Sequence, residues 1–159
     1  MNLTGIGYDV HRFASGRPLI LGGVEIPHSH GLDGHSDADV LAHAIADAVL
    51  GAVGERDIGH HFPNSDESIR GISSLEILRK VARLLAGAGA RIINVDATLI
   101  AEAPKIAPHV DKMRENLAAA LEIPVARVGV KATTNERMGF LGRGEGIAAM
   151  AVASVVSNQ

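Results

Sequence analysis

Residues 35–52, HSDADVLAHAIADAVLGA, contain the segment that predicts the first helix of the fold. Apolar side chains recur there at the spacing of one helix face, at Val40, Leu41, Ala44, Ile45, Ala48 and Val49. Ser36 precedes the segment and can cap its first turn, and Gly51 and Gly54 mark its end. Its small side chains permit close packing against neighbouring elements.

The residues before this helix predict a β-rich beginning. Residues 3–13 have the pattern of a strand, and residues 19–21 and 24–26 flank Gly22-Gly23 as the arms of a hairpin would. After the helix, residues 57–72 combine Gly, Pro, Asn, Ser and Asp, which is the composition of a loop. Function often resides on such loops.

A second helix is predicted to begin at Ser73, which forms a capping-box pattern with Glu76, and to end near Gly87 and Gly89. Residues 94–99 then alternate polar and apolar side chains, as a strand with one polar face does. The chain therefore alternates between strand and helix beyond its first third.

The last third of the chain continues this alternation. A third helix is predicted over residues 106–121, with Pro108 in its first turn, and a further strand includes residues 128–130. A Gly-rich stretch covers residues 139–146. Residues 147–156 are ambiguous, because alanine favours a helix and valine favours a strand.

This order predicts a single domain over residues 1–159 with an α/β (α+β) fold, in which a mixed β-sheet carries helices on one face. The uncovered face of such a sheet requires a partner, and oligomerisation would supply it.

Composition narrows the classes of function. The chain has a net charge of −3, 3% aromatic residues and no cysteine, which argues against nucleic-acid binding and against a disulfide framework. Any zinc site must use histidine and carboxylate ligands. No signal peptide and no bilayer-spanning stretch is seen in the sequence, so a cytoplasmic location and no membrane association are expected.

Asp9, His11 and His43 are the candidate metal ligands. Asp9 and His11 lie two residues apart in the first strand, so their side chains point to the same face of the sheet. His43 lies within the first helix, one turn from both Asp39 and Asp47, either of which could orient its ring. Two histidines and one carboxylate leave an open coordination position, as in catalytic zinc sites. The alternative is that all three are ordinary polar residues of a strand and a helix.

Two further groups could bind phosphate. His35 and Ser36 lie at the start of the first helix, where free backbone amides accept an anion. Residues 131–136, KATTNE, place a cation, hydroxyl groups and a carboxylate after a strand, and Arg143 could clamp a phosphate or pair with Glu145. Each could instead be a polar turn. His28, His30 and His60 are given no functional role.

Six blocks of the chain resemble one known family. They are GYDVHRF (7–13), HSDADVLAHAIADAVLGA (35–52), DIGHHFP (57–63), AEAPK (101–105), KATTNE (131–136) and GFLGRGEGIA (139–148). In this order they are similar to the 2-C-methyl-D-erythritol 2,4-cyclodiphosphate synthases of the non-mevalonate isoprenoid pathway. The resemblance covers nearly the whole chain.

The resemblance implies a phosphorus–oxygen lyase that forms a cytoplasmic homotrimer, with its sheets packed around the threefold axis and its active sites between subunits. The substrate would be 4-diphosphocytidyl-2-C-methyl-D-erythritol 2-phosphate, whose 2-phosphate attacks the β-phosphorus, closes a cyclic diphosphate and releases CMP. Zn²⁺ or another divalent ion would be held by Asp9, His11 and His43. Mg²⁺ or Mn²⁺ would bridge the diphosphate with help from Glu136.

The resemblance also assigns the remaining site residues. Catalytic positions would be His35, Thr134 and Glu136. The substrate would be bound by Asp9, His11, His35, Ser36, Asp57, Ile58, Gly59, Phe62, Pro63, Asn64, Ser65, Asp66, Ala101, Glu102, Ala103, Pro104, Lys105, Ile106, Ala107, Thr133, Thr134, Asn135, Glu136, Phe140 and Arg143. An isoprenoid diphosphate could bind in an apolar channel on the threefold axis, near Tyr8, Arg143 and Glu145.

One block departs from the family pattern. The family commonly has FPDTD where this chain has Phe62-Pro63-Asn64-Ser65-Asp66, so one carboxylate is lost while hydrogen-bonding capacity remains. We expect altered substrate affinity from this change and no loss of activity.

Two other functions are compatible with parts of the pattern. A metal-dependent phosphohydrolase could use the same ligands to activate water and would release inorganic phosphate. A non-catalytic trimeric module that binds a metabolite would need no metal and would tolerate His43→Ala. The joint presence of the triad, His35-Ser36, Thr133-Thr134 and Glu136 favours the synthase over both.

Overall fold

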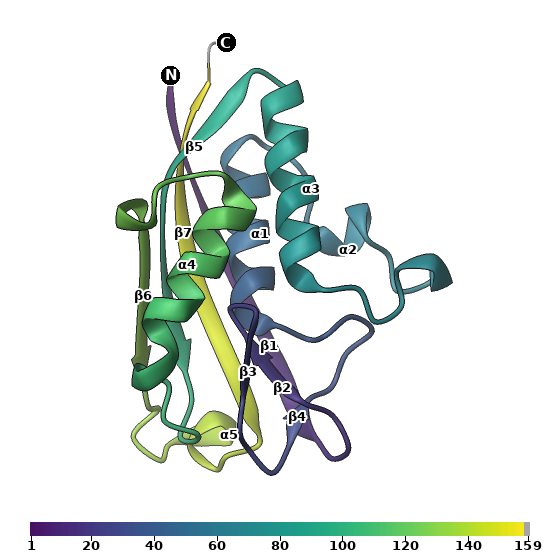
Figure 1. Ribbon diagram of the computed structural model, residues 1–159, viewed down its shortest axis with the longest axis vertical. Coiled ribbons are helices and arrows are strands. Elements are labelled where there is room, and N and C mark those ends of the chain that lie inside the picture. Colours follow the sequence, from purple (N-terminus) through teal and green to yellow (C-terminus); the bar gives the residue numbers. More distant parts are fainter. Residues whose placement is uncertain (158–159) are drawn as a thin grey trace.

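The computed structural model describes residues 1–157 and consists of one mixed sheet with helices on one face (Figure 1). The strand order is β4-β1-β7-β5-β6, and only β5 and β6 are parallel neighbours. These strands are β1 (Asn2–Ala14), β4 (Gly31–Leu32), β5 (Ala90–Ile100), β6 (Val128–Thr133) and β7 (Gly146–Ser157). A separate hairpin joins β2 (Leu19–Leu21) to β3 (Val24–Ile26).

The helices α1 (Val40–Ala52), α3 (Ser74–Gly87) and α4 (Val110–Leu121) pack on the same face of the sheet (Figure 1). Short helical turns connect the longer elements: α2 (Ile58–His61), η1 (Glu67–Ile69), η2 (Ala107–His109), η3 (Val125–Arg127) and α5 (Gly139–Gly142). Thus the segment 57–72, predicted as a loop, contains two helical turns. Within residues 1–157, no helix is long and apolar enough to cross a membrane.

The central helix α1 is almost completely buried between the sheet and α3. It lies directly on β1, because Gly5 and Gly7 have no side chain on the face that meets it. A Cβ atom added to Gly7 would lie 1.9 Å from the carbonyl oxygen of Ala44, and one added to Gly5 would lie 2.0 Å from that of Ala48. The small residues of α1 and the two glycines of β1 therefore allow contact between backbones.

The predicted strands, hairpin and three long helices are confirmed, and residues 147–156 form a strand. The predicted cap of the first helix was wrong, whereas Ser73 is confirmed as the N-cap residue of α3 but without the predicted capping-box hydrogen bonds. Asp39 caps α1 and accepts a hydrogen bond from the backbone amide of Ala42, whereas Ser36 lies too far upstream. The Ser73 side chain forms no capping hydrogen bond, and Glu76 pairs with Arg79 and Arg83 instead.

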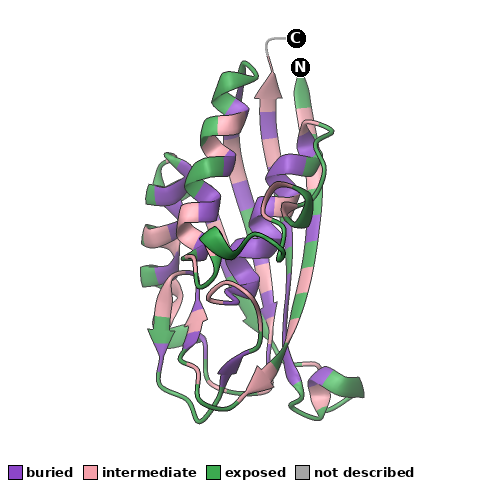
Figure 2. Cartoon of the chain, turned by 90° about the vertical axis from the view of Figure 1, so that its right-hand side faces the viewer, coloured by how far each residue is buried: buried purple, intermediate pink, exposed green. Residues whose placement is uncertain are grey.

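The sheet face opposite α1 exposes apolar side chains. Ile6, Tyr8 and Val10 of β1 lie in register with Val152, Met150 and Ala148 of β7. Ile6 is 68% exposed, Tyr8 51% and Val152 45%. The burial colouring of Figure 2 shows exposed and partly exposed residues along these strands. A face of this kind is typical of an interaction surface.

We expect Gly7→Ala to destabilise the protein by about 1–3 kcal/mol or more, because the added methyl group must displace the backbone of α1. Thermal unfolding followed by circular dichroism would measure the change. Gly87→Ala is the matched control, because a Cβ atom there meets no heavy atom within 4 Å. Equal melting temperatures for Gly7→Ala and the unsubstituted protein would contradict the close approach of α1 and β1.

Candidate metal centre

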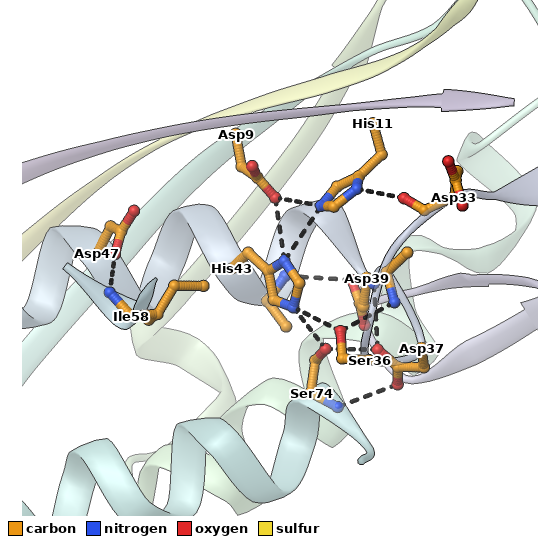
Figure 3. A network of polar contacts seen from close by, with 12 residues as sticks. Asp9, His11, Asp33, Ser36, Asp37, Asp39, His43, Asp47, Ile58 and Ser74 are labelled. Carbon is orange, nitrogen blue, oxygen red and sulfur yellow. Dashed lines mark hydrogen bonds and ion pairs between the residues drawn. The ribbon is translucent and has the colours of Figure 1, made fainter. Parts of the chain in front are cut away.

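Asp9, His11 and His43 converge at the contact between β1 and α1 (Figure 3). Asp9 Oδ2 lies 2.9 Å from His11 Nε2 and 3.0 Å from His43 Nδ1, and the two ring nitrogens are 3.3 Å apart. Tetrahedral ligands with bonds of about 2.0–2.2 Å to zinc lie roughly 3.3 Å from one another. The predicted triad is confirmed as a group that can hold a divalent ion.

Hydrogen bonding orients His11 for this purpose. Its Nδ1 lies 2.6 Å from the carbonyl oxygen of Asp33, which can only accept. Nδ1 therefore carries the proton in the neutral ring, and Nε2 presents its lone pair to the centre of the triad. A backbone carbonyl in this position is a common second-layer partner of histidine ligands.

The charges of the triad favour its ionised carboxylate. Burial acts to raise the pKa of Asp9, but hydrogen bonds and charge from His11 and His43, when their rings are protonated, outweigh it and lower the pKa from 3.8 to about 2. The pKa of His11 is raised above its ordinary value. Burial acts to lower it, but the Asp9 carboxylate and the Asp33 carbonyl together outweigh burial. A proton and a divalent ion thus compete for the same place between these side chains.

The prediction that Asp39 or Asp47 orients the ring of His43 was wrong. Asp39 is fully buried. It accepts hydrogen bonds from the amides of Gly22 and Gly23 and from the amide of Ala42 in the first turn of α1. Asp47 accepts from the amide of Ile58 at 2.8 Å. Each carboxylate is thereby used in joining α1 to a neighbouring segment, and His43 Nε2 instead faces the hydroxyl groups of Ser36 and Ser74 at 3.2 and 2.8 Å.

A cavity of about 220 Å³ is lined by the triad and also by the first of the two predicted phosphate-binding groups. His35 and Ser36 line it, together with Gly59, Phe62 and Asn64. His35 Nε2 lies 3.2 Å from the backbone oxygen of Asp66. The predicted metal ligands and one predicted phosphate-binding pair therefore share one cavity with part of the 57–66 segment.

The second predicted phosphate-binding group contributes to a different cavity, of about 700 Å³. Thr134 and Glu136 line this cavity together with Glu102. Thr134 Oγ1 donates to Glu136 Oε1 at 3.3 Å. The Glu102 carboxylate accepts from the amides of Asn135 and Arg137, at 3.3 and 2.7 Å. It thereby holds Glu136 and Arg137, which both have the positive φ angles that non-glycine residues rarely adopt.

A third cavity, of about 910 Å³, is lined by Phe140, Ala103 and Glu145, and also by His28 and His30, which the sequence analysis left without a role. Arg143 pairs with Glu145 at 3.3 Å, in the turn before β7. Lys131, the cation of the KATTNE block, forms an ion pair with Asp96 on the neighbouring strand.

The remaining predicted substrate residues lie in the segments that border these cavities. Asp57 caps α2, Ile58 begins it, and Asp66 caps η1. Ala101 donates its amide to the Thr133 oxygen, Ala101 and Ile106 are buried, and Pro104 follows a cis peptide bond. Pro63 and Ser65 lie in the turn before η1, Lys105 is exposed, and Ala107 begins η2.

Sequence reasoning missed residues that support the site from outside it. Arg17 donates to the backbone oxygens of Gly34 and Ser36, at 2.5 and 2.6 Å, so its guanidinium group spans the two sides of His35. Ser74 contacts the far side of His43, and Asp37 in turn contacts the Ser74 hydroxyl group. No spacing rule connects these residues to the triad, because the contacts depend on how loops and α3 pack.

Comparison with known proteins identifies the family. The YgbB family model matches residues 3–156. The chain is 61% identical over 155 residues to the 2-C-methyl-D-erythritol 2,4-cyclodiphosphate synthase of Akkermansia muciniphila, covering 97% of this chain and 92% of that protein. It is 60% identical over 152 residues to the synthase of Alkaliphilus metalliredigens, covering 96% of each.

Solved structures agree with this fold. The bifunctional IspDF of Campylobacter jejuni matches with a TM-score of 0.93 and 41% identity over 98% of this chain and 42% of that one. A CDP complex of IspF from Plasmodium falciparum matches with a TM-score of 0.86 and 32% identity, over 99% of this chain and 97% of that one. The fold and the site thus define the class of α+β proteins to which these enzymes belong. The chain is a member of the YgbB family, that of the 2-C-methyl-D-erythritol 2,4-cyclodiphosphate synthases.

We expect zinc to raise the melting temperature of the metal-free protein, since an ion bound only to the folded state stabilises it by about 2.7 kcal/mol at a hundred times its dissociation constant. His43→Ala should abolish this shift, because one of the three ligands is removed. His60→Ala is the control, since His60 is exposed and outside the triad. A zinc-dependent shift of equal size in His43→Ala would contradict the site.

Proposed function

We propose that the chain converts 4-diphosphocytidyl-2-C-methyl-D-erythritol 2-phosphate into 2-C-methyl-D-erythritol 2,4-cyclodiphosphate and CMP, as a phosphorus–oxygen lyase of the non-mevalonate pathway. The observation that carries the proposal is the Asp9-His11-His43 triad, which opens into the same cavity as His35 and Ser36. The names of the relatives support it, as does the CDP present in a related structure.

The triad residues fit a divalent ion, for which we propose Zn²⁺. When bound, this ion would neutralise charge on the phosphate oxygens of the substrate. His35 lies beside the triad and can donate a hydrogen bond to a phosphoryl oxygen. Thr134 supplies a hydroxyl donor, and the Glu136 carboxylate suits Mg²⁺ or Mn²⁺ on the diphosphate. The reaction is intramolecular, so these residues orient two phosphates and exclude water.

We propose that the active unit is a homotrimer with sites between subunits. In one chain, the triad lies in one cavity while Thr134 and Glu136 line another, so an approach of the two groups requires a second copy. The exposed apolar face of β1 and β7 supplies a surface for that contact. The cytoplasmic location and the axial isoprenoid diphosphate near Tyr8, Arg143 and Glu145 stay predictions.

Phosphorus NMR of the protein incubated with the cytidylyl substrate, zinc and magnesium would test the reaction. We expect CMP and the cyclic diphosphate in equal amounts, and loss of both products in His43→Ala. Inorganic phosphate as the product would favour a metal-dependent phosphohydrolase in place of the synthase. No turnover by folded, metal-loaded protein would favour a non-catalytic binding module.

The altered substrate segment gives a separate prediction. Asn64 lines the cavity beside the triad. Asn64→Asp should lower KM by up to about tenfold with little change in kcat, because a carboxylate accepts stronger hydrogen bonds from substrate hydroxyl groups than an amide does. Asn2→Asp, which adds the same charge at an exposed position at the start of β1, is the control. A collapse of kcat in Asn64→Asp would overturn this interpretation.

A further inference from the structure

Two polar side chains behind the metal centre have no part in the proposed reaction. Ser74 is the first residue of α3 and is fully buried, and its hydroxyl oxygen lies 2.8 Å from His43 Nε2. The same hydroxyl group contacts the carboxylate of Asp37. Figure 3 shows the resulting row, from Asp37 through Ser74 to the ring of His43 and on to Asp9. It joins the loop before α1 and the start of α3 to a candidate metal ligand.

The direction of each hydrogen bond in this row follows from counting protons. Asp37 Oδ1 accepts from the amide of Asp39 at 3.1 Å, and Oδ2 accepts from the amide of Ser74 at 3.0 Å. Both oxygens thus face amide donors, as expected of a carboxylate that only accepts. Ser74 must therefore donate its single hydroxyl proton to Asp37. Toward His43 it can offer only lone pairs.

His43 Nε2 consequently carries a proton and donates it to Ser74. In the neutral imidazole the other nitrogen, Nδ1, is then a lone pair. Nδ1 is the atom that faces Asp9 Oδ2 at 3.0 Å and His11 Nε2 at 3.3 Å. Only a nitrogen with a free lone pair can bind a metal ion, so the row selects the tautomer that the centre needs.

We propose that Ser74, held by Asp37, is a positioning residue that fixes the Nε2-protonated tautomer of His43 and aims Nδ1 at the bound ion. This inference rests on the metal centre of the proposed function. The Asp33 carbonyl oxygen acts in the same way on His11, but from a backbone group that substitution leaves in place. Ser74 is the side chain through which this arrangement can be altered.

Ser36 does not duplicate the role of Ser74. Its hydroxyl oxygen is farther from His43 Nε2, at 3.2 Å, and already accepts from the amide of Ala38. With Nε2 protonated, His43 takes no proton from Ser36. The hydroxyl proton of Ser36 is then free to be donated into the cavity beside the triad, which Ser36 lines. The two serines that contact His43 thus have different tasks.

Zinc affinity, measured by competition with a chromophoric chelator, tests the inference with the metal alone. Ser74→Ala should weaken zinc binding by about 10–100-fold, the usual cost of losing a partner behind a ligand. Its kcat should return toward that of the unsubstituted protein at saturating zinc. Ser73→Ala is the matched control, because this neighbouring serine is exposed and its side chain forms no capping hydrogen bond. Equal zinc affinity in Ser74→Ala and the unsubstituted protein would overturn the role of Ser74.

The tautomer can be read without any substitution at Ser74. Long-range proton–nitrogen NMR of the metal-free protein, at a pH well above the ordinary pKa of histidine, distinguishes protonated from unprotonated ring nitrogens. His43→Ala assigns the signals. A proton on Nε2 supports the inference and a proton on Nδ1 overturns it, even if Ser74→Ala does not fold. If the unsubstituted protein bound no zinc, the proposed metal centre would fail, whereas this spectrum would still decide the tautomer.

Discussion

The contact between the backbones of β1 and α1 is the constraint on which the rest of the structure depends. Gly5 and Gly7 leave no side chain between the strand and the carbonyl oxygens of Ala48 and Ala44. The alternation of a strand then places Asp9 and His11 on this same face, just beyond the end of the close contact. His43 precedes Ala44 on the helix. A helix held at ordinary distance by larger residues would carry His43 out of reach of the two strand ligands, so packing and metal site have one cause.

Polar groups are tolerated beside the core because backbone amides satisfy them. Asp39, which caps the start of α1, accepts hydrogen bonds from three backbone amides of the hairpin and the helix. Asp47 accepts one from the amide of Ile58. Buried carboxylates are costly unless they are hydrogen-bonded in this way. Burial and the nearby charge of Asp37 raise the pKa of Asp39 to about 6, which indicates that the three hydrogen bonds only partly offset its desolvation. These carboxylates fix the loops around the cavity and leave the triad as the group that can hold a divalent ion.

Much of this arrangement could be predicted from periodicity, because residues 3–13 and 94–99 alternate and the helices repeat as amphipathic or buried segments do. The triad followed from the same rules, since a two-residue spacing on a strand sets a common face. The cap of α1, the side-chain hydrogen bonds at the start of α3 and the partners of His43 could not be predicted in this way. Asp39, Asp47 and Ser74 all lie within reach of some amide or ring, and the packing of α3 and the hairpin decides among them. Residues 147–156 were ambiguous because Ala and Val have opposite preferences, and pairing with both β1 and β5 resolves the choice in favour of a strand.

The division of the candidate site between cavities has a physical reason. The triad depends on the contact of α1 with β1, the second strand from one edge of the sheet, whereas Thr134 and Glu136 follow β6 at the opposite edge. The intervening strands β7 and β5 keep these groups apart within one chain. A rigid sheet cannot bend enough to bring its two edges together. A second copy of the chain, packed through the apolar face of β1 and β7, can instead bring its own β6 close to the triad of the first copy. Assembly would then bury that face and complete the site in one step, which ties the proposed chemistry to association of the chains.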